Sequence, residues 1–148
     1  MQEVNIYIAT TARGPRVNRH AYYSYILECE LNGKTVRRDG TGMLKDATEN
    51  QSELTAIIAA FKRLTKPCSV RVFTQCEHIL NSVNNGWVYQ WKKNNWIKSG
   101  NRPVKNALLW QQLINLSTEH VVKFTKDTGK YFAEQEQILN RMQEADNG

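Results

Sequence analysis

Alternating apolar and polar residues predict β-strands in the first forty positions. The segment 4–8 has apolar residues at every second position, which is typical of a strand with one buried face. The segment 21–30 is rich in Tyr and Ile and predicts a second strand. Asn32-Gly33 is the strongest short signal for a two-residue hairpin, so we expect the segment 34–38 to return as a third strand.

Apolar residues spaced three and four apart predict a helix over 52–64, which Asn50 or Gln51 would begin. The segment 69–74 is short and apolar-rich and predicts a strand. The later pattern predicts helices at 77–83, 87–94, 104–116 and 132–142, a loop at 101–103 and a strand at 119–125. Five strands interleaved with helices favour an α/β fold, a five-stranded mixed sheet flanked by helices.

Composition is ordinary for a soluble globular chain of 148 residues, with 41% hydrophobic and 23% charged residues. This length predicts one domain over 1–148. The three cysteines are an odd number without a C-x-x-C pair, which indicates reduced thiols in a cytoplasmic protein and no zinc-finger metal site. Neither a signal peptide nor an apolar stretch long enough for a bilayer is expected, so we expect no membrane partner.

Charge is distributed unevenly along the chain. The formal net charge is +6, and the segment 78–118 contains no Asp or Glu. Cations interleaved with aromatic rings suit nucleic acid, because cations neutralise phosphates and flat rings stack on bases. The segment holds every tryptophan, at 87, 91, 96 and 110, and five cations that we consider binding candidates: Lys92, Lys93, Lys98, Arg102 and Lys105.

Tryptophans at helical spacing are more often part of a core than of a ligand platform. We therefore expect Trp110, and at least one of Trp87 and Trp91, to be mainly packing residues. Trp96 follows two asparagines and is the ring that we expect to be exposed and available for stacking on nucleic acid. A second cationic cluster at Arg13, Arg16 and Arg19 either binds phosphate or only keeps the protein soluble.

Several motifs resemble those of type 1 ribonuclease H of the bacterial kind, which carries a basic protrusion called the handle. The segment 87–96 reads W-x-x-x-W-K-K-x-x-W, as in that handle, and 102–106 reads R-P-V-K-N, as in the residues that follow it. The segment 48–54 reads T-x-N-x-x-E-L, similar to the start of the first family helix. The resemblance implies a ribonuclease-H-like fold, a handle over 87–105, and roles for Thr48 and Asn50 in binding nucleic acid.

The resemblance also implies where an active site would lie. Members of the family hold two Mg²⁺ ions with four carboxylates, the oxygen ligands that hard divalent cations require. At the matching positions this chain has Ala9, Glu53, Gln75 and Gln137, so Glu53 is the only carboxylate retained. A site with one carboxylate would leave two dications repelling each other, and we therefore expect no metal to be held there.

These residues lead to a hypothesis with two alternatives. The first expectation is a pseudoenzyme that binds RNA–DNA hybrid or duplex nucleic acid after losing cleavage, without a cofactor. The second is an active endoribonuclease that uses Mg²⁺ or Mn²⁺ with rearranged ligands, for which Glu77 and Glu134 are the nearest spare acids. The third is a protein-interaction scaffold that keeps only the fold, with a protein partner or a homodimer. Fold alone does not decide among them.

Overall fold

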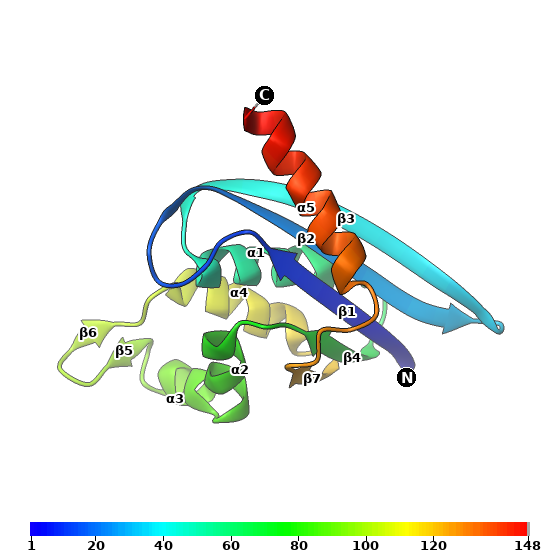
Figure 1. Ribbon diagram of the computed structural model, residues 1–148. Helices are drawn as coiled ribbons and strands as arrows, with labels where there is room; N and C mark the ends of the chain where they lie inside the picture. The colour runs from blue at the N-terminus through cyan, green and yellow to red at the C-terminus, as the bar shows by residue number, and fades with distance from the viewer. Residues whose placement is uncertain (148) are drawn as a thin grey trace.

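The structure, a computed structural model, describes residues 1–147 and is built around one five-stranded sheet with the strand order β3-β2-β1-β4-β7 (Figure 1). The strands of this sheet are β1 (Gln2–Thr10), β2 (Asn18–Leu31), β3 (Lys34–Ala47), β4 (Cys68–Phe73) and β7 (Val121–Thr125). The helices are α1 (Glu49–Phe61), α2 (Glu77–Asn84), α3 (Trp87–Lys93), α4 (Ala107–Ser117) and α5 (Phe132–Asn147), and a small hairpin is formed by β5 (Ile97–Lys98) and β6 (Arg102–Pro103).

The sheet is mixed, as the sequence predicts. β1 is antiparallel to β2, and β2 is antiparallel to β3. On its other side β1 is parallel to β4, which is parallel to β7. The expected α/β architecture with five strands is therefore confirmed. Across residues 1–147, no helix is both long and apolar enough to cross a membrane.

The first hairpin is longer than the sequence predicts. Asn32 and Gly33 both have positive φ, 53° and 77°, which suits the tight turn expected there. β3 does not end near residue 38 but continues to Ala47. Gly40 lies beneath the ring of Tyr25, where a Cβ atom would lie only 2.1 Å from Tyr25 Cζ. Glycine is thus required by packing within the strand and does not end it.

The first helix begins earlier than expected. Thr48 is its N-cap: the Thr48 side chain accepts a hydrogen bond from Gln51 N, and the Gln51 side chain accepts one from Thr48 N, which makes a capping box. The prediction that Asn50 or Gln51 starts the helix was wrong by two or three residues, because the cap bonds depend on side-chain geometry. The segment 101–103, expected to be a loop, contributes β6 to the small hairpin.

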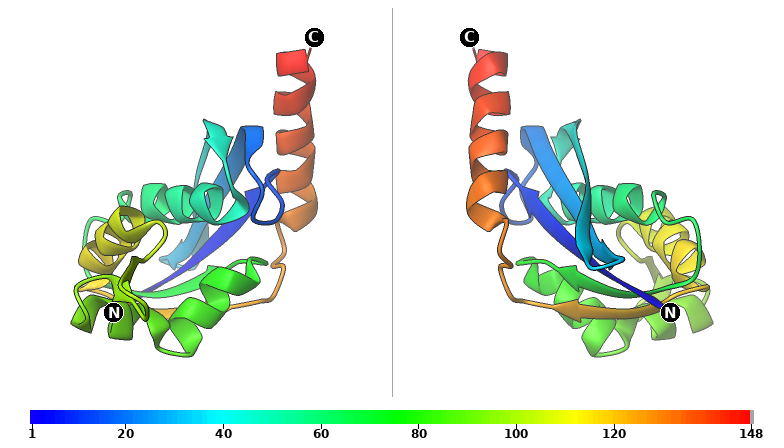
Figure 2. Two further views of the ribbon diagram at one scale, coloured as in Figure 1. Left: turned by 90° about the vertical axis from the view of Figure 1, so that its left-hand side faces the viewer. Right: turned by 90° about the vertical axis from the view of Figure 1, so that its right-hand side faces the viewer.

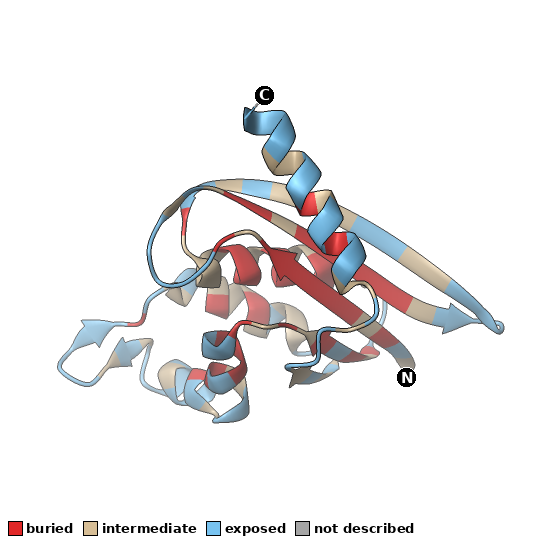
Figure 3. Ribbon diagram, viewed as in Figure 1, coloured by how far each residue is buried: buried red, intermediate tan, exposed pale blue. Residues whose placement is uncertain are grey.

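Helices cover the two faces of the sheet unequally. α1 and α4 lie against one face, and α5 crosses the other (Figure 2). The larger core is on the α1 side, where Ile6, Leu54 and Trp110 are among its fully buried members. On the α5 side Ala9, Tyr22 and Leu139 form a much smaller cluster. Burial is concentrated in β1 and α1, whereas the region from α3 to β6 is mostly exposed (Figure 3).

Candidate functional site

Ala9 lies near the C-terminal end of the central strand, under α5. It is buried and packs against Tyr22 of β2 and Leu139 of α5. A methyl group offers no donor to a cation, so this position cannot supply the carboxylate that the family places there.

Glu53 on α1 is the retained carboxyl group, and it points into the protein. Its side chain is 3% exposed, and Thr74 Oγ1 donates a hydrogen bond to Glu53 Oε2 over 3.1 Å. Burial raises the pKa of Glu53 to about 8, and the nearby Glu49 adds to the rise, while the Thr74 hydrogen bond and the charge of Arg13 oppose it. At neutral pH Glu53 is therefore mostly protonated and uncharged.

The two glutamines differ in their surroundings. Gln75 follows β4, and its Nε2 donates a hydrogen bond to the backbone carbonyl of Lys126, which links the ends of β4 and β7. Gln137 is exposed on α5. The α5 residue beside Ala9 is instead Glu136, since both line the same hollow.

Sequence reasoning placed Gln137 at this position and missed Glu136. The inward stripe of α5 contains Phe132, Gln135 and Leu139, at spacings of three and four. Glu136 is one turn from Phe132 and from Leu139, so it borders that stripe, whereas Gln137 faces outward. The spacing of the inward-facing residues along α5 was the sequence signal that could have indicated Glu136.

A hollow of about 250 Å³ occupies the space between the end of β1, the loop that follows it and α5. Ala9, Thr10 and Arg13 line one wall, and Phe132 and Glu136 line the other. One carboxylate and one guanidinium thus face the same small space, with an alanine at its base. The hollow has room for a group the size of a phosphate.

The residues present do not fit a centre of two magnesium ions. Within residues 1–147 no group of three or more His, Cys, Asp or Glu side chains is arranged to hold a metal ion. Glu53 is buried and accepts a hydrogen bond from Thr74, and Ala9 supplies no oxygen. Glu136 is the one acid that lines the hollow beside Ala9, and Arg13 adds a positive charge to the same space.

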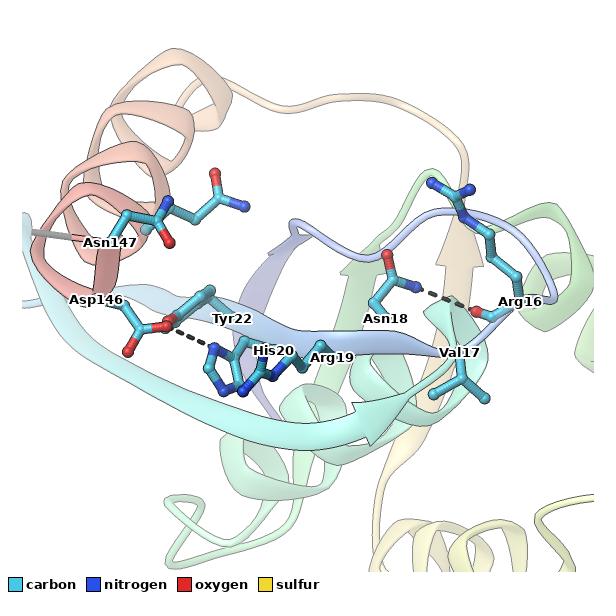
Figure 4. A pocket seen from close by; sticks show the side chains of 9 residues that line it. Arg16, Val17, Asn18, Arg19, His20, Tyr22, Asp146 and Asn147 are labelled. Carbon is cyan, nitrogen blue, oxygen red and sulfur yellow. Dashed lines mark hydrogen bonds and ion pairs between the residues drawn. The ribbon is translucent and has the colours of Figure 1, made fainter.

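A second hollow lies nearer the C-terminal end of α5. This larger hollow, of about 610 Å³, lies between the start of β2 and the last turns of α5, and Arg16 and Arg19 are among its lining residues (Figure 4). His20 Nδ1 lies 2.5 Å from Asp146 Oδ2 at one end, and Arg16 is at the other (Figure 4). Gln143 borders both hollows. Arg13 therefore lines one hollow beside α5, and Arg16 and Arg19 line the other.

Thr48 and Asn50 lie at the start of α1 and take part in local hydrogen bonds. Thr48 forms the capping box, and Asn50 Oδ1 accepts a hydrogen bond from Cys76 Sγ over 3.1 Å. Both residues are half-buried. The Asn50 amide nitrogen has no hydrogen-bond partner within residues 1–147, so it is free to donate to an incoming ligand.

The handle is the segment 87–105, which comprises α3, β5 and β6, and it projects from the body of the protein (Figure 1). Its cations form no ion pair with any acid in the part of the chain that the structure describes. Lys98 is half-buried, with its Nζ 5.9 Å from the centre of the Trp91 ring. The exposed cations are Lys92, Lys93, Arg102 and Lys105.

The tryptophans divide differently from the expectation. Trp110 is fully buried and Trp91 packs edge-on against it, with 6.3 Å between ring centres, so their packing roles are confirmed. Trp96 was expected to be the exposed ring, and that prediction was wrong: it is half-buried and packs against the main core. Trp87, 39% exposed, is the accessible tryptophan.

The backbone explains why Trp96 turns inward. Asn95 and Trp96 both have positive φ, 56° and 63°, and Trp96 N donates a hydrogen bond to Trp91 O over 2.7 Å. Val104 N donates to Trp96 O over 3.0 Å, which closes the base of the small hairpin. Two consecutive left-handed residues after α3 fold the chain back on itself and bring the ring onto the core.

The protein's similarity to known proteins agrees with this architecture. The family model for RNase H matches residues 3–129. The ribonuclease H of Clostridium botulinum strain Hall is 34% identical over 130 residues, which cover 87% of this chain and 85% of the relative. The ribonuclease H of Caldanaerobacter subterraneus subsp. tengcongensis is 33% identical over 109 residues, 74% of this chain and 71% of the relative.

Solved structures show the same fold. A type 1 RNase H that carries the type 2 active-site motif superimposes with a TM-score of 0.73 at 23% identity, over 95% of this chain and 70% of that chain. A foamy viral protease-reverse transcriptase in complex with RNA/DNA hybrid superimposes with a TM-score of 0.64 at 14% identity, over 92% of this chain and 18% of that one. The fold is thus that of an RNase H, and with the family match over 3–129 the chain belongs to the RNase H family.

Proposed function

We propose that this protein binds RNA–DNA hybrid or duplex nucleic acid and does not cleave it by the two-metal reaction of its family. The observation that carries the proposal is the set of residues at the family's catalytic positions: Ala9 offers no ligand, and Glu53 is buried and accepts a hydrogen bond from Thr74. Family membership supports nucleic acid as the ligand. Family membership accounts for the fold and for the class of ligand. The residues at the catalytic positions favour binding without two-metal cleavage.

The charge distribution supports the binding part. The four exposed handle cations have no acidic partner within residues 1–147, and the arginine loop lies beside α5. Cations of this kind neutralise backbone phosphates and release counterions, which gives affinity with little sequence preference. We propose Trp87, rather than Trp96, as the ring available for stacking, since Trp87 is the more exposed.

A second candidate is an active ribonuclease with rearranged ligands. Glu136 beside Ala9 favours it, because this carboxylate is placed where a metal could use it. The relatives from Clostridium botulinum and Caldanaerobacter are named ribonuclease H, which favours it as well. For this candidate Mg²⁺ or Mn²⁺ would be the cofactor, held by fewer carboxylates than in the family.

One pair of assays tests the proposal. Fluorescence anisotropy with labelled hybrid, duplex RNA and duplex DNA measures binding, and gel analysis of the same hybrid with millimolar Mg²⁺ or Mn²⁺ measures cleavage. We expect binding that weakens with salt and no metal-dependent cleavage. Cleavage that disappears in Glu136→Gln or Glu53→Gln would establish the active alternative. No binding to any of the three nucleic acids, even at low salt, would leave the scaffold hypothesis.

We also propose a reducing compartment, the cytoplasm, as the place of action. Cys68 and Cys76 are buried and Cys29 is half-buried, and all three are free thiols. Free thiols persist where glutathione keeps them reduced. Their burial is consistent with a structural role.

A further inference from the structure

Arg13 stands at the mouth of the hollow that Ala9 leaves open. The loop after β1 carries it, and Arg13 Nη1 donates hydrogen bonds to the carbonyl oxygens of Thr10 and Ala12, over 2.5 and 2.9 Å. These two bonds fix the guanidinium against the end of β1. The guanidinium is therefore tied to the backbone at this site, while Arg13 as a whole is exposed and accessible to a ligand.

The rest of the guanidinium is available to a ligand. Within residues 1–147, Arg13 Nε and Nη2 have no hydrogen-bond acceptor, and no carboxylate oxygen lies within ion-pair distance of Arg13. A guanidinium carries five N–H donors in a planar fork that matches two oxygens of a phosphate. Three of those donors, on Nε and Nη2, are left for such a partner.

Arg13 also supplies positive charge where the metals of the family would supply it. It lines the same hollow as Ala9 and Glu136, and its charge reaches Glu53, whose pKa it lowers against the larger effect of burial. Ala9 adds no negative charge to this space. The charged side chains that line the hollow are therefore the guanidinium of Arg13 and the carboxylate of Glu136.

We propose that Arg13 binds a backbone phosphate of the nucleic acid in the hollow beside Ala9, taking the place of the metal ions, so that the former catalytic centre holds a phosphodiester without cutting it. This proposal rests on the proposed nucleic-acid binding and adds the anchoring residue and the ligand group. No covalent step is involved. A guanidinium binds phosphate, but unlike a metal ion it does not generate hydroxide from a bound water.

Arg13→Ala, Arg13→Gln and Arg13→Lys test the proposal, with Arg141→Ala as control. Arg141 is exposed on α5 and makes no hydrogen bond or ion pair within residues 1–147, so this variant changes the charge equally without touching the hollow. Binding to RNA–DNA hybrid is measured by anisotropy across a series of salt concentrations. Thermal unfolding of each variant shows whether it is folded.

We expect Arg13→Ala and Arg13→Gln to bind about tenfold more weakly, as for one charge-assisted contact. The slope of log K against log salt should fall by about 0.7 to 0.9, because one phosphate is no longer neutralised. Arg13→Gln keeps a donor for the Thr10 and Ala12 carbonyls, so it tests the charge even if Arg13→Ala unfolds. Arg13→Lys should retain the slope and lose part of the affinity, because it keeps the charge without the fork.

The two proposals fail in different ways. If the parent protein binds no nucleic acid, the proposed function is wrong. If the parent binds, and Arg13→Gln changes affinity and salt slope no more than Arg141→Ala does, nucleic-acid binding stands and the role of Arg13 is overturned. A decrease in affinity with an unchanged slope would also contradict it, because that pattern indicates a structural effect on the loop.

Discussion

Thr74 and Glu53 form a buried hydrogen bond, with 3.1 Å between Thr74 Oγ1 and Glu53 Oε2. Thr74 follows the end of β4 and Glu53 lies on α1, so the bond joins the sheet to the helix that covers its main core. Glu53 is buried, so this bond contributes to the packing of α1 on the sheet. The presence of the family's glutamate at position 53 is therefore not, by itself, evidence that this residue has a catalytic role.

Glu53→Gln should change how stability depends on pH. Burial raises the pKa of Glu53 from the ordinary 4.5 to about 8, so between these values the folded protein holds a proton that the unfolded chain releases. The free energy of unfolding should therefore decrease as pH rises from 4.5 to 8, by at most about 1.4 kcal/mol per pH unit. Glu53→Gln should remove this decrease.

Urea unfolding of both proteins from about pH 6.5 to about pH 8.5 measures the effect. His78, whose pKa burial lowers below its ordinary 6.5, contributes at the lower end of this window, but equally in both proteins, so its effect cancels in the comparison. The difference in unfolding free energy between the two proteins should change steadily across the window. A constant difference would mean that Glu53 is ionised throughout and able to bind a metal.

Ala9→Asp with Gln75→Asp should restore metal binding in part. The double variant adds two carboxylates to a site that already has Glu136 beside Ala9 and Glu53 nearby. Hard cations bind sites with several oxygen ligands, so we expect measurable Mn²⁺ binding by calorimetry where the parent shows none. Ala9→Asn with Gln75→Asn is the neutral control. Equal Mn²⁺ binding by the Asp and Asn variants would contradict our placement of these positions.

Lys92→Ala with Lys93→Ala should weaken nucleic-acid binding and make it less dependent on salt. The slope of log K against log salt should fall by about 0.7 to 0.9 for each phosphate that a lysine no longer neutralises. Both lysines are exposed and make no ion pair within residues 1–147, so folding should be unaffected. Lys62→Ala, an exposed lysine at the end of α1, is the control. A double variant with the parent's salt slope would exclude this part of the handle from the interface.

Trp87→Ala should weaken nucleic-acid binding, whereas Trp96→Ala should lower the stability of the fold. Trp87 is 39% exposed, so its removal should weaken binding at nearly unchanged stability, by about 1 to 3 kcal/mol if one base stacks on it. Trp96 packs against the core, so its removal should lower the melting temperature. Anisotropy and thermal unfolding on both variants measure the two effects. If Trp96→Ala weakens binding without a change in stability, the assignment of the two rings is reversed.

Gly129→Ala should be strongly destabilising. Gly129 has a φ of 74°, and a Cβ atom there would lie 2.4 Å from Cδ1 of Tyr7. The Tyr7 ring cannot move away readily, since it stacks on Phe73 with 4.7 Å between ring centres. We expect the free energy of unfolding to decrease by about 2 to 5 kcal/mol, from the left-handed backbone and the clash together. The measurement is urea unfolding.

Gly86→Ala is the matched control for this substitution. Gly86 has a similar φ of 75° but nothing within 4 Å of the position its Cβ would take. Its substitution should cost only the backbone part, about 1 to 2 kcal/mol. Equal destabilisation in the two variants would show that Tyr7 yields to the added methyl group.

Local patterns predicted the elements well, because each element's signal lies within its own segment. Asn32-Gly33 marked the hairpin, and the alternation over 4–8 marked the central strand. The C-terminal end of β3 could not be predicted from local patterns. Gly40 and Gly42 look like strand breakers in sequence, and only their partners Tyr25 and Tyr23 on the neighbouring strand explain them.

For the candidate site, too, sequence indicates positions that lie in a local motif and does not indicate those that depend on tertiary contacts. Glu53 lies in the T-x-N-x-x-E-L motif over 48–54, whereas α5 has no such motif, and the α5 residue that lines the hollow beside Ala9 is Glu136, one position before the expected Gln137. Sequence also could not show that Trp96 turns inward, since that depends on two left-handed residues in succession. The protonation of Glu53 likewise follows from burial, which is a tertiary property.

The left-handed turns of the handle have a consequence for the kinetics of association. Asn95, Trp96 and Asn101 all have positive φ, and hydrogen bonds at Trp96 hold the hairpin base closed. A handle whose shape is set in the free protein loses little conformational entropy when a ligand arrives. Substitutions in its turns should therefore slow association by making the binding-competent shape rarer, while substitutions of its lysines should act on electrostatic attraction and on the lifetime of the complex.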